Sequence, residues 1–534
     1  MKKTLDEIIE IILFVLSGVA TSLLVCGRYT LTKIGVLTVL STLALGIIFC
    51  KFREKECFKK VNKKYLLIAF ICATYTISKL VKYIGGGTYY LIYVLKALKI
   101  DISVKVSTAV IATGSVPFVT LLIYYLMNKC IPFWKKEYQQ IDKIDKIFLV
   151  VIGIITFAVS SILYNSTYIY TGNGVDETVD SDIIYTTDSA TLIREDVYTN
   201  LSAFENDIRQ PLFGLFSLPF SIPARAISEV LSFIPNSYYI IFATIQVILL
   251  GISVIMIGKL IGISGKNKIP FYIFVFSTFG YIIFSFAYEQ YIISLFYLIT
   301  AIYVGVFNKL EVNYYYIGAT GTLLTSGIIF PLITKTENTK KDFFNIFKCC
   351  IAFLFTFIIS AKILIVPGLV NKYIAFKEFT GQNVLFINRL KQFTNFVKSI
   401  FIAPEASVIN NEAYWLEPVK SISIIGVAIL VICLISFIMN RKNKFAKISF
   451  LWIIFSFIIL CVIGWGTQEN GLILYSLYFG WAYISLMYMF INKIIKNDKI
   501  KTGIILLMCI VFCLVNIPEF IKIFEFGLEF YKII

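Results

Sequence analysis

Runs of about 20 apolar residues, repeated along almost the whole chain, are the feature that most limits its fold. A run of this length in a bilayer forms a helix, because backbone polar groups find no water there and must bond to one another. We place the runs at 8–26, 34–50, 65–84, 105–127, 147–165, 237–258, 270–287, 291–306, 314–333, 349–366, 422–440, 448–465, 471–492 and 502–518. They predict an all-α polytopic membrane protein with about 13 transmembrane helices plus a broken or re-entrant helix.

Composition supports this class. Of the 534 residues 58% are hydrophobic and 15% are charged, whereas about a quarter of a soluble domain is charged. The formal net charge of +17 does not indicate a nucleic-acid partner, because Lys and Arg collect on the cytoplasmic side of membrane proteins.

The basic clusters predict the orientation of the chain. They lie at 51–64, 129–146, 259–268, 441–447 and 493–501. All five fall on one side if the N-terminus is cytoplasmic, which predicts a multi-pass protein of the cell membrane. The loops 166–236 and 367–420 would then be extracytoplasmic.

The run 314–333 does not fit this orientation as a single crossing, because it would place Lys335, Lys340 and Lys341 outside. It contains three glycines and several hydroxyl side chains, which let a helix break where protein or water satisfies the freed backbone. We therefore expect a re-entrant hairpin here. A full crossing with a weak charge anomaly is the alternative.

The loop 166–236 has ten acidic and three basic side chains. The chain contains no histidine, so acid–base chemistry would fall to carboxylates. Asp188 and Asp196 are the catalytic candidates, and Asp188 is placed to cap a short helix over 189–205. The segment 204–233, with its prolines, is typical of interfacial helices on the outer leaflet. Alternatively, the acidity serves only to keep the loop hydrated.

Short motifs in this loop and after it resemble the GT-C superfamily of membrane glycosyltransferases, the class of protein O-mannosyltransferases and aminoarabinose transferases. Thr187-Asp188-Ser189-Ala190 matches the family's Asp near the start of the first large loop, and Arg209-Gln210-Pro211-Leu212-Phe213 matches a His-Pro element near its end, with Gln in place of His. Glu289 lies in Phe286–Tyr291 and Glu469 in Gln468–Ser476, at turns where the family is similar.

The resemblance implies transfer of a sugar from a polyprenyl-phosphate donor to a glycan, lipid or protein acceptor of the cell envelope. Asp188 would be the general base or would hold a divalent cation, Mg or Mn. Donor-phosphate or substrate binding would involve Arg209, Gln210, Glu289, Arg389 and Glu469, since Arg binds phosphate in bidentate geometry. Membrane lipids would be the other partners.

The resemblance also sets the expected domains. Residues 131–518 would form the GT-C-like core, including both external loops, after an accessory module of four spans in residues 1–130 and before a tail at 519–534. A flippase or transporter of lipid-linked oligosaccharide is the alternative function, since it also uses many spans and a broken helix. A polysaccharide polymerase, which takes a similar donor, is a third.

Overall fold

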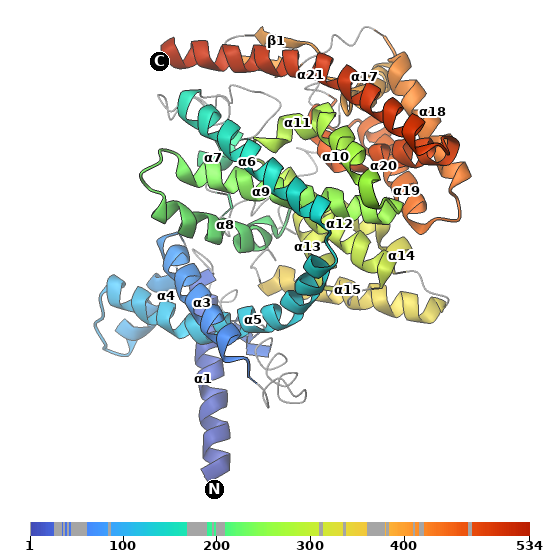
Figure 1. Ribbon diagram of the computed structural model, residues 1–534. Helices are drawn as coiled ribbons and strands as arrows, with labels where there is room; N and C mark the ends of the chain where they lie inside the picture. The colour runs from blue at the N-terminus through green and yellow to red at the C-terminus, as the bar shows by residue number, and fades with distance from the viewer. Residues whose placement is uncertain are drawn as a thin grey trace. The chain divides into compact units, whose positions relative to one another are not determined.

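The structure is a computed structural model that consists almost entirely of helices (Figure 1). It describes residues 2–25, 35, 38–39, 42–43, 61–83, 87–167, 189–194, 197–198, 209–308, 313–334, 338–359, 380, 384–409, 412–415, 421–467 and 472–533. The predicted all-α class is confirmed, with one short antiparallel strand pair added among the described residues.

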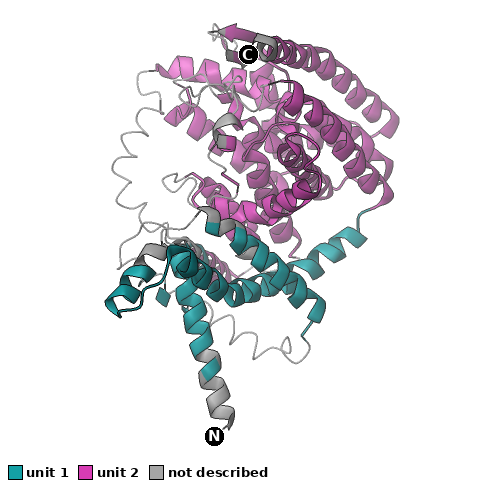
Figure 2. Cartoon of the chain, turned by 90° about the vertical axis from the view of Figure 1, so that its left-hand side faces the viewer, with its two compact units in different colours: residues 1–141, 199–205, 351–366 teal, residues 142–198, 206–350, 367–534 magenta. Residues whose placement is uncertain are grey.

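The chain divides into two compact units (Figure 2). Unit 1 comprises Met1–Ile141, Thr199–Glu205 and Ile351–Val366, and unit 2 comprises Asp142–Tyr198, Asn206–Cys350 and Pro367–Ile534. The expected domain limits at residues 130 and 518 stay predictions.

Unit 1 is built around the long helix α5. Its helices are α1 (Lys2–Val25), α3 (Lys63–Tyr83), α4 (Gly87–Ala97) and α5 (Val104–Gln139). Helices α1, α3 and α4 all pack against α5. A buried cluster of Leu23, Leu24, Ile77 and Ile111 joins α1, α3 and α5, so this unit has an apolar core of its own.

Unit 2 contains most of the remaining elements. They are α6 (Lys143–Ser166), α7 (Ser189–Arg194), α8 (Phe213–Val230), α9 (Ser237–Ile261), η1 (Gly265–Asn267), α10 (Lys268–Ser277), α11 (Phe279–Ser285), α12 (Tyr291–Phe307), α13 (Asn313–Thr322), η2 (Leu324–Ile329), α14 (Phe330–Ile333), α17 (Phe386–Ser399), β1 (Ala406–Ile409), β2 (Glu412–Trp415), α18 (Ile424–Met439), α19 (Lys444–Phe457), the π-helix η4 (Ile458–Ile463), η5 (Leu472–Tyr475), α20 (Ser476–Ile494) and α21 (Asp498–Ile533). Helix α15 (Thr339–Ile359) begins in unit 2 and continues past its boundary.

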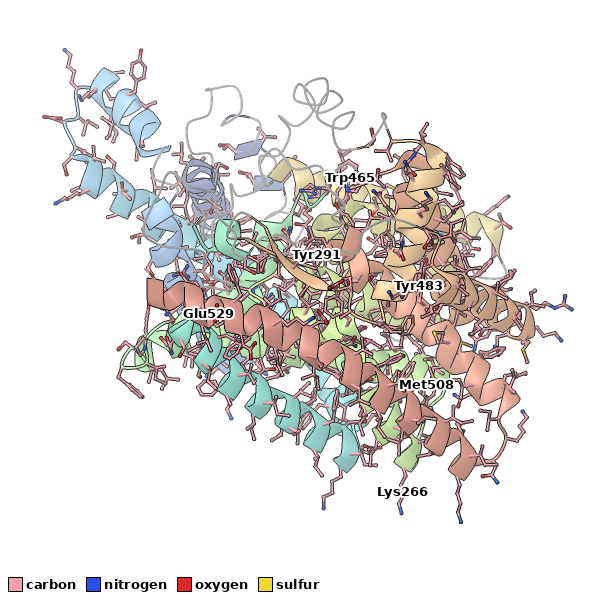
Figure 3. The ribbon with its side chains drawn as sticks, turned by 90° about the horizontal axis from the view of Figure 1, so that it is seen from above. Lys266, Tyr291, Trp465, Tyr483, Met508 and Glu529 are labelled. Atoms are coloured by element: carbon pink, nitrogen blue, oxygen red, sulfur yellow. The ribbon has the colours of Figure 1, made fainter. Side chains whose placement is uncertain are left out.

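Three buried helices form the core of unit 2. Helix α9 packs against α6, α8 and α12, while α20 packs against α18 and α19. Tyr291 and Tyr483, on α12 and α20, lie among the packed helices, whereas Lys266 projects from the edge (Figure 3). Helices α6 and α21 keep apolar faces exposed, with Leu514 70% accessible. Such faces suit contact with lipid, which is as apolar as leucine.

Six helices in the described part of the chain are long and apolar enough to cross a membrane: Val104–Gln139, Lys143–Ser166, Ser237–Ile261, Lys444–Ile463, Leu472–Ile494 and Asp498–Glu529. A seventh span results if Gly265–Ser277 and Phe279–Ser285 are counted together. The protein is therefore a membrane protein. The other expected spans, which bring the number to about 13, stay predictions.

The expected span 270–287 is not one continuous helix. It bends by 77° between α10 and α11, at Thr278. The backbone N–H groups of Phe279 and Gly280 are freed by the break and donate to the carbonyl oxygens of Phe401 and Ile400, at 3.2 and 3.3 Å. The two acceptors lie more than 100 residues further along the chain. Because they are so distant in sequence, the apolar run by itself does not predict the bend.

Asn516, fully buried on α21, joins the end of α10 to the segment 401–403 by hydrogen bonds. Its side-chain nitrogen donates to the carbonyl oxygens of Ser277 (2.8 Å) and Phe401 (2.9 Å), and its oxygen accepts from the N–H of Ala403 at 2.7 Å. A little further on, Glu519 accepts from the N–H of Ala406, which begins β1. Strands β1 and β2 pair from Ala406 with Trp415 to Ile409 with Glu412.

We expect Asn516→Leu to destabilise the protein strongly. The change leaves one N–H without its partner and takes a donor from two carbonyls, and each buried backbone group left unpaired costs about 1–3 kcal/mol. Thermal unfolding of the purified protein measures the effect. Leu514→Ala, on the exposed face of the same helix, should change the free energy of unfolding by less than about 0.5 kcal/mol. An equal loss in both variants would contradict the role of Asn516.

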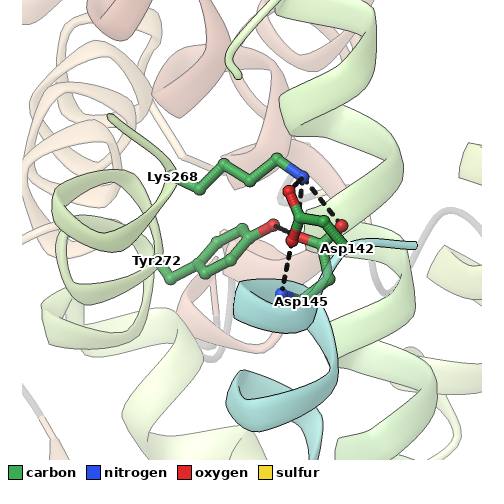
Figure 4. A network of polar contacts seen from close by, with 4 residues as sticks. All are labelled: Asp142, Asp145, Lys268 and Tyr272. Atoms are coloured by element: carbon green, nitrogen blue, oxygen red, sulfur yellow. Dashed lines mark hydrogen bonds and ion pairs between the residues drawn. The ribbon is translucent and has the colours of Figure 1, made fainter. Parts of the chain in front are cut away.

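An ion network joins the first turns of α6 and α10 (Figure 4). The Lys268 ammonium lies 2.6 Å from Asp142 and 2.8 Å from Asp145, and the Tyr272 hydroxyl donates to Asp145. Asp145 is fully buried. Burial tends to raise the pKa of Asp142, but hydrogen bonds from Lys268 and from the Asp145 N–H lower it. Asp142 and Lys268 therefore form an ion pair.

Candidate functional site

Glu289 is the buried carboxylate of the candidate site. It lies in the short connection between α11 and α12 and is fully inaccessible to solvent. The hydroxyl of Ser189, the first residue of α7, donates to its Oε1 at 3.4 Å. These two residues are 100 positions apart, so the contact fixes one segment of the acidic loop against the α11–α12 connection.

Gln246 and Tyr198 lie close to Glu289. Gln246, on α9, donates from Nε2 to the backbone oxygen of Glu289 and to the Tyr198 hydroxyl. Burial raises the pKa of Tyr198 well above its usual value, and the nearby Glu289 charge raises it further. Tyr198 therefore stays a neutral phenol at physiological pH. Ser217 and Ser221, on α8, both donate to its backbone oxygen.

Gln210 extends the site toward α20. It is buried, and its Nε2 donates to the hydroxyl of Tyr478. Tyr478 in turn donates to Ser294 on α12 at 3.5 Å, and its ring meets Tyr291 edge-on at 4.7 Å between centroids. Tyr478 thus connects Gln210 to the first turns of α12, the helix that follows Glu289.

The segment that carries Gln210 is held by the interrupted helix that follows α12. Leu212 donates its N–H to the carbonyl of Gly321 at 2.8 Å, and Leu324 donates to the carbonyl of Arg209 at 2.9 Å. Helix α13 ends at Thr322, one residue before Leu323. Backbone groups freed by the interruption are therefore satisfied by residues 209–212, which fixes Arg209 and Gln210 in place.

Two arginines meet at the turn that follows η4. The Arg209 guanidinium lies over the Trp465 ring, 5.9 Å from its centroid, and Arg389 donates from Nη1 to the carbonyl of Val462 at 2.6 Å. Gly464 has φ +79°, and a Cβ there would lie 2.6 Å from the Arg389 Cδ. The turn thus needs glycine both for its backbone and to let the Arg389 side chain pass.

The structure describes four of the seven predicted site residues. Arg209 and Arg389 come to one turn, Glu289 lies just before α12, and Tyr478 connects Gln210 to α12. Asp188, Asp196 and Glu469 lie outside the described residues. The helix expected over 189–205 is shorter than predicted, because Val197 and Tyr198 lie in a turn after α7.

Tyr198, Gln246 and Tyr478 were missed by sequence reasoning. Gln246 carries the one usable signal, since an uncharged amide in the middle of a transmembrane helix requires hydrogen-bond partners. Among the described residues no three Cys, Asp or Glu side chains lie together as a metal-binding group. The expected Mg or Mn at Asp188 stays a prediction.

No protein-family model, curated protein or solved structure matches this chain. Fold and site together define an all-helical membrane protein with a buried polar centre of one carboxylate, several amides and neutral hydroxyls.

Proposed function

We propose that the protein is an integral membrane glycosyltransferase of the GT-C type, which moves a sugar from a polyprenyl-phosphate donor to a cell-envelope acceptor on the extracytoplasmic face. The hydrogen bond between Ser189 and Glu289 carries the proposal. Ser189 directly follows Asp188 in the chain, so the segment proposed to supply the general base meets a buried carboxylate from a separate motif.

The residues divide the chemistry between them. Asp188 takes the proton of the acceptor hydroxyl, with Asp196 as the second candidate. Glu289 accepts a hydrogen bond from the sugar. Arg209 and Arg389 balance the charge of the donor phosphate at the Gly464 turn, where Arg389 has a buried Nε without a partner in the described part of the chain. Glu469, which follows that turn in the chain, would help to bind the donor or substrate. Mg or Mn held by Asp188 would act as a Lewis acid.

The function is tested by analysing lipid-linked sugars and envelope glycans of a strain that lacks the protein. We expect the sugar-loaded polyprenyl carrier to accumulate and one sugar to disappear from the envelope, and the wild-type gene to restore both. Unchanged glycans and unchanged carrier pools in the deletion strain would refute the proposal.

A flippase or transporter remains the second candidate because two helices of unit 2 are interrupted, at Thr278 and at Leu323. Broken helices near the midplane are typical of transporters. Flipping of a fluorescent lipid-linked sugar in vesicles containing the purified protein, without transfer to an acceptor, would favour this reading. Lengthened glycan chains as the product would favour a polymerase.

The proposed orientation places the connection before α9 outside the cell and the connection after it in the cytoplasm. Cysteines at the exposed positions Ser232 and Lys266 flank this single apolar helix. In intact cells we expect a membrane-impermeant thiol reagent to label Ser232→Cys and not Lys266→Cys, above the background of the parent chain. Lysis should then expose Lys266→Cys. The reverse pattern would overturn the orientation and with it the extracytoplasmic site.

The segment 314–333 is proposed to return to the side it leaves. Its interruption at Leu323 supports a hairpin, as do the lysines that follow. We expect a cysteine at the exposed Asn338 to be labelled only after lysis, as Lys266→Cys is. Labelling of Asn338→Cys in intact cells would instead favour a simple crossing.

A further inference from the structure

Lysines gather at the starts of three helices of unit 2, namely α6, α10 and α21. The chain contributes the segments 142–146, 266–268 and 496–501. Together these segments hold seven lysines and three aspartates, which gives a net charge of +4. An excess of positive charge on neighbouring segments attracts anions.

Direct contacts hold the three segments together. The Lys268 ammonium lies 2.6 Å from Asp142 (Figure 4), which joins the second segment to the first. Asn267 donates a hydrogen bond to the Asp498 side chain, which joins the second segment to the third. Helix α10 also packs against both α6 and α21. The starts of the three helices therefore lie at one end of unit 2.

Three exposed lysines adjoin these contacts directly. Lys143, Lys266 and Lys499 are neighbours in the chain of Asp142, Asn267 and Asp498, and all three are exposed. Lys266 projects from the edge of the packed helices (Figure 3). We call these three lysines the basic rim.

The aspartates of the three segments have lysine partners of their own. Asp142 and Asp145 both lie within 2.8 Å of Lys268, and Asp498 lies 2.7 Å from Lys501. These pairs leave one negative charge unbalanced. The three positive charges of the basic rim exceed it, so the rim favours an anionic ligand.

Exposed apolar side chains lie next to the basic rim on the same three helices. They are Ile147 on α6, Ile269 on α10 and Ile500 on α21, and each is at least 47% accessible. The apolar face continues along α6 with Val150 and along α21 with Leu507, both exposed. Such faces suit contact with lipid. A ligand of the rim would therefore meet positive charge and a lipid-facing surface together.

We propose that the basic rim binds the headgroup of an anionic phospholipid, with the acyl chains against the exposed faces of α6 and α21. The phosphate brings a negative charge and acceptor oxygens to the ammonium groups, which are donors only. Basic side chains at the ends of membrane helices bind anionic headgroups in this way. A soluble anion would leave the apolar faces uncovered. In the proposed orientation the lipid belongs to the cytoplasmic leaflet.

The test uses the purified full-length protein in an uncharged detergent. Phosphatidylglycerol, phosphatidylcholine with the same acyl chains, inorganic phosphate and polyglutamate are added separately, and the unfolding temperature is followed against concentration. Ligands that bind only the folded state raise that temperature in a saturable way. We expect saturable stabilisation by phosphatidylglycerol and a much smaller effect from the other three. Added salt should weaken the stabilisation, because the basic rim is exposed.

The decisive variant replaces the three lysines of the rim by glutamine. Lys143→Gln, Lys266→Gln and Lys499→Gln together remove three charges but leave the paired Lys268 and Lys501 in place. The unliganded variant should therefore unfold at nearly the temperature of the wild type. We expect its affinity for phosphatidylglycerol to fall about tenfold or more, since each basic side chain near an anionic headgroup strengthens binding several-fold.

The matched control removes three charges from another basic cluster of the same unit. Arg441, Lys442 and Lys447 are exposed around the start of α19. Arg441→Gln, Lys442→Gln and Lys447→Gln together should leave the affinity close to that of the wild type. Equal losses in the two triple variants would overturn the inference, because they would indicate diffuse attraction to the whole basic surface.

Three other results would also contradict the inference: no stabilisation by phosphatidylglycerol; equal stabilisation by phosphatidylcholine or by inorganic phosphate; or stabilisation by polyglutamate alone, which would indicate an acidic protein partner. None of these measurements depends on sugar transfer. Failure here would therefore reject the lipid site and leave the proposed function to be decided by the glycans of the deletion strain.

Discussion

Asp188→Asn should reduce sugar transfer by about 10²–10⁴-fold, the usual cost of a lost general base. Asparagine keeps the size of the side chain and its ability to accept a hydrogen bond, but it cannot take a proton at physiological pH. The measurement is restoration of the envelope glycan in the deletion strain, with the amount of each variant in the membrane determined by immunoblot. We expect normal amounts of protein and almost no glycan.

Two further variants show whether the effect is specific. Asp176→Asn alters a carboxylate of the same loop that has no proposed role, and it should restore the glycan fully. Glu289→Gln should give an intermediate loss, because it weakens one charge-assisted hydrogen bond without removing the base. Full restoration by Asp188→Asn at normal protein amounts would make Asp188 structural. A loss in Glu289→Gln alone would move the base to Glu289.

Lys268→Met should lower the free energy of unfolding by about 3–5 kcal/mol, the typical cost of breaking a buried ion pair from one side. The fully buried Asp145 would lose its ammonium partner at 2.8 Å and keep the hydrogen bond from the Tyr272 hydroxyl. Thermal unfolding of the purified protein, or the fraction folded after extraction, measures the loss.

A double variant separates the loss of the pair from the burial of a lone charge. Asp145→Asn with Lys268→Met removes both charges while Asn can still accept from Tyr272, so it should recover most of the stability. The pair of Lys522 and Glu519 is a surface control, with the lysine side chain 52% exposed. Lys522→Met should therefore change the stability much less than Lys268→Met does, because water screens an exposed ion pair. A double variant as unstable as Lys268→Met would show that the ion pair itself stabilises the fold.

The positions of the helices follow from the sequence because the bilayer imposes a local rule. A run of about 20 apolar residues must satisfy its own backbone hydrogen bonds, so its helix can be placed without knowing its neighbours. The runs at 147–165 and 237–258 correspond to α6 and α9 within a few residues. The glycines in 314–333 also indicate a discontinuity, and the helix is interrupted at Leu323.

The motif order places Glu289 and Gln210 among the site candidates, but it does not say what surrounds them. Tyr198 lies in a turn, Gln246 on α9 and Tyr478 on α20, and none of the three belongs to a recognisable motif. Their contacts form only where packing brings α9, α12, α20 and the turn after α7 together.

The sequence by itself thus determined the class of protein and the approximate positions of its apolar helices, because hydropathy and charge act locally. It also predicted that the acidic loop carries the chemistry. Tertiary structure alone decided the bend at Thr278, which depends on Ile400, Phe401 and Asn516. It also decided the contact of Ser189 with Glu289 and the meeting of Arg209 with Arg389 at one turn. A hydrogen bond between residues 100 positions apart produces no periodic pattern in the sequence. Such contacts can therefore be found only in the folded structure.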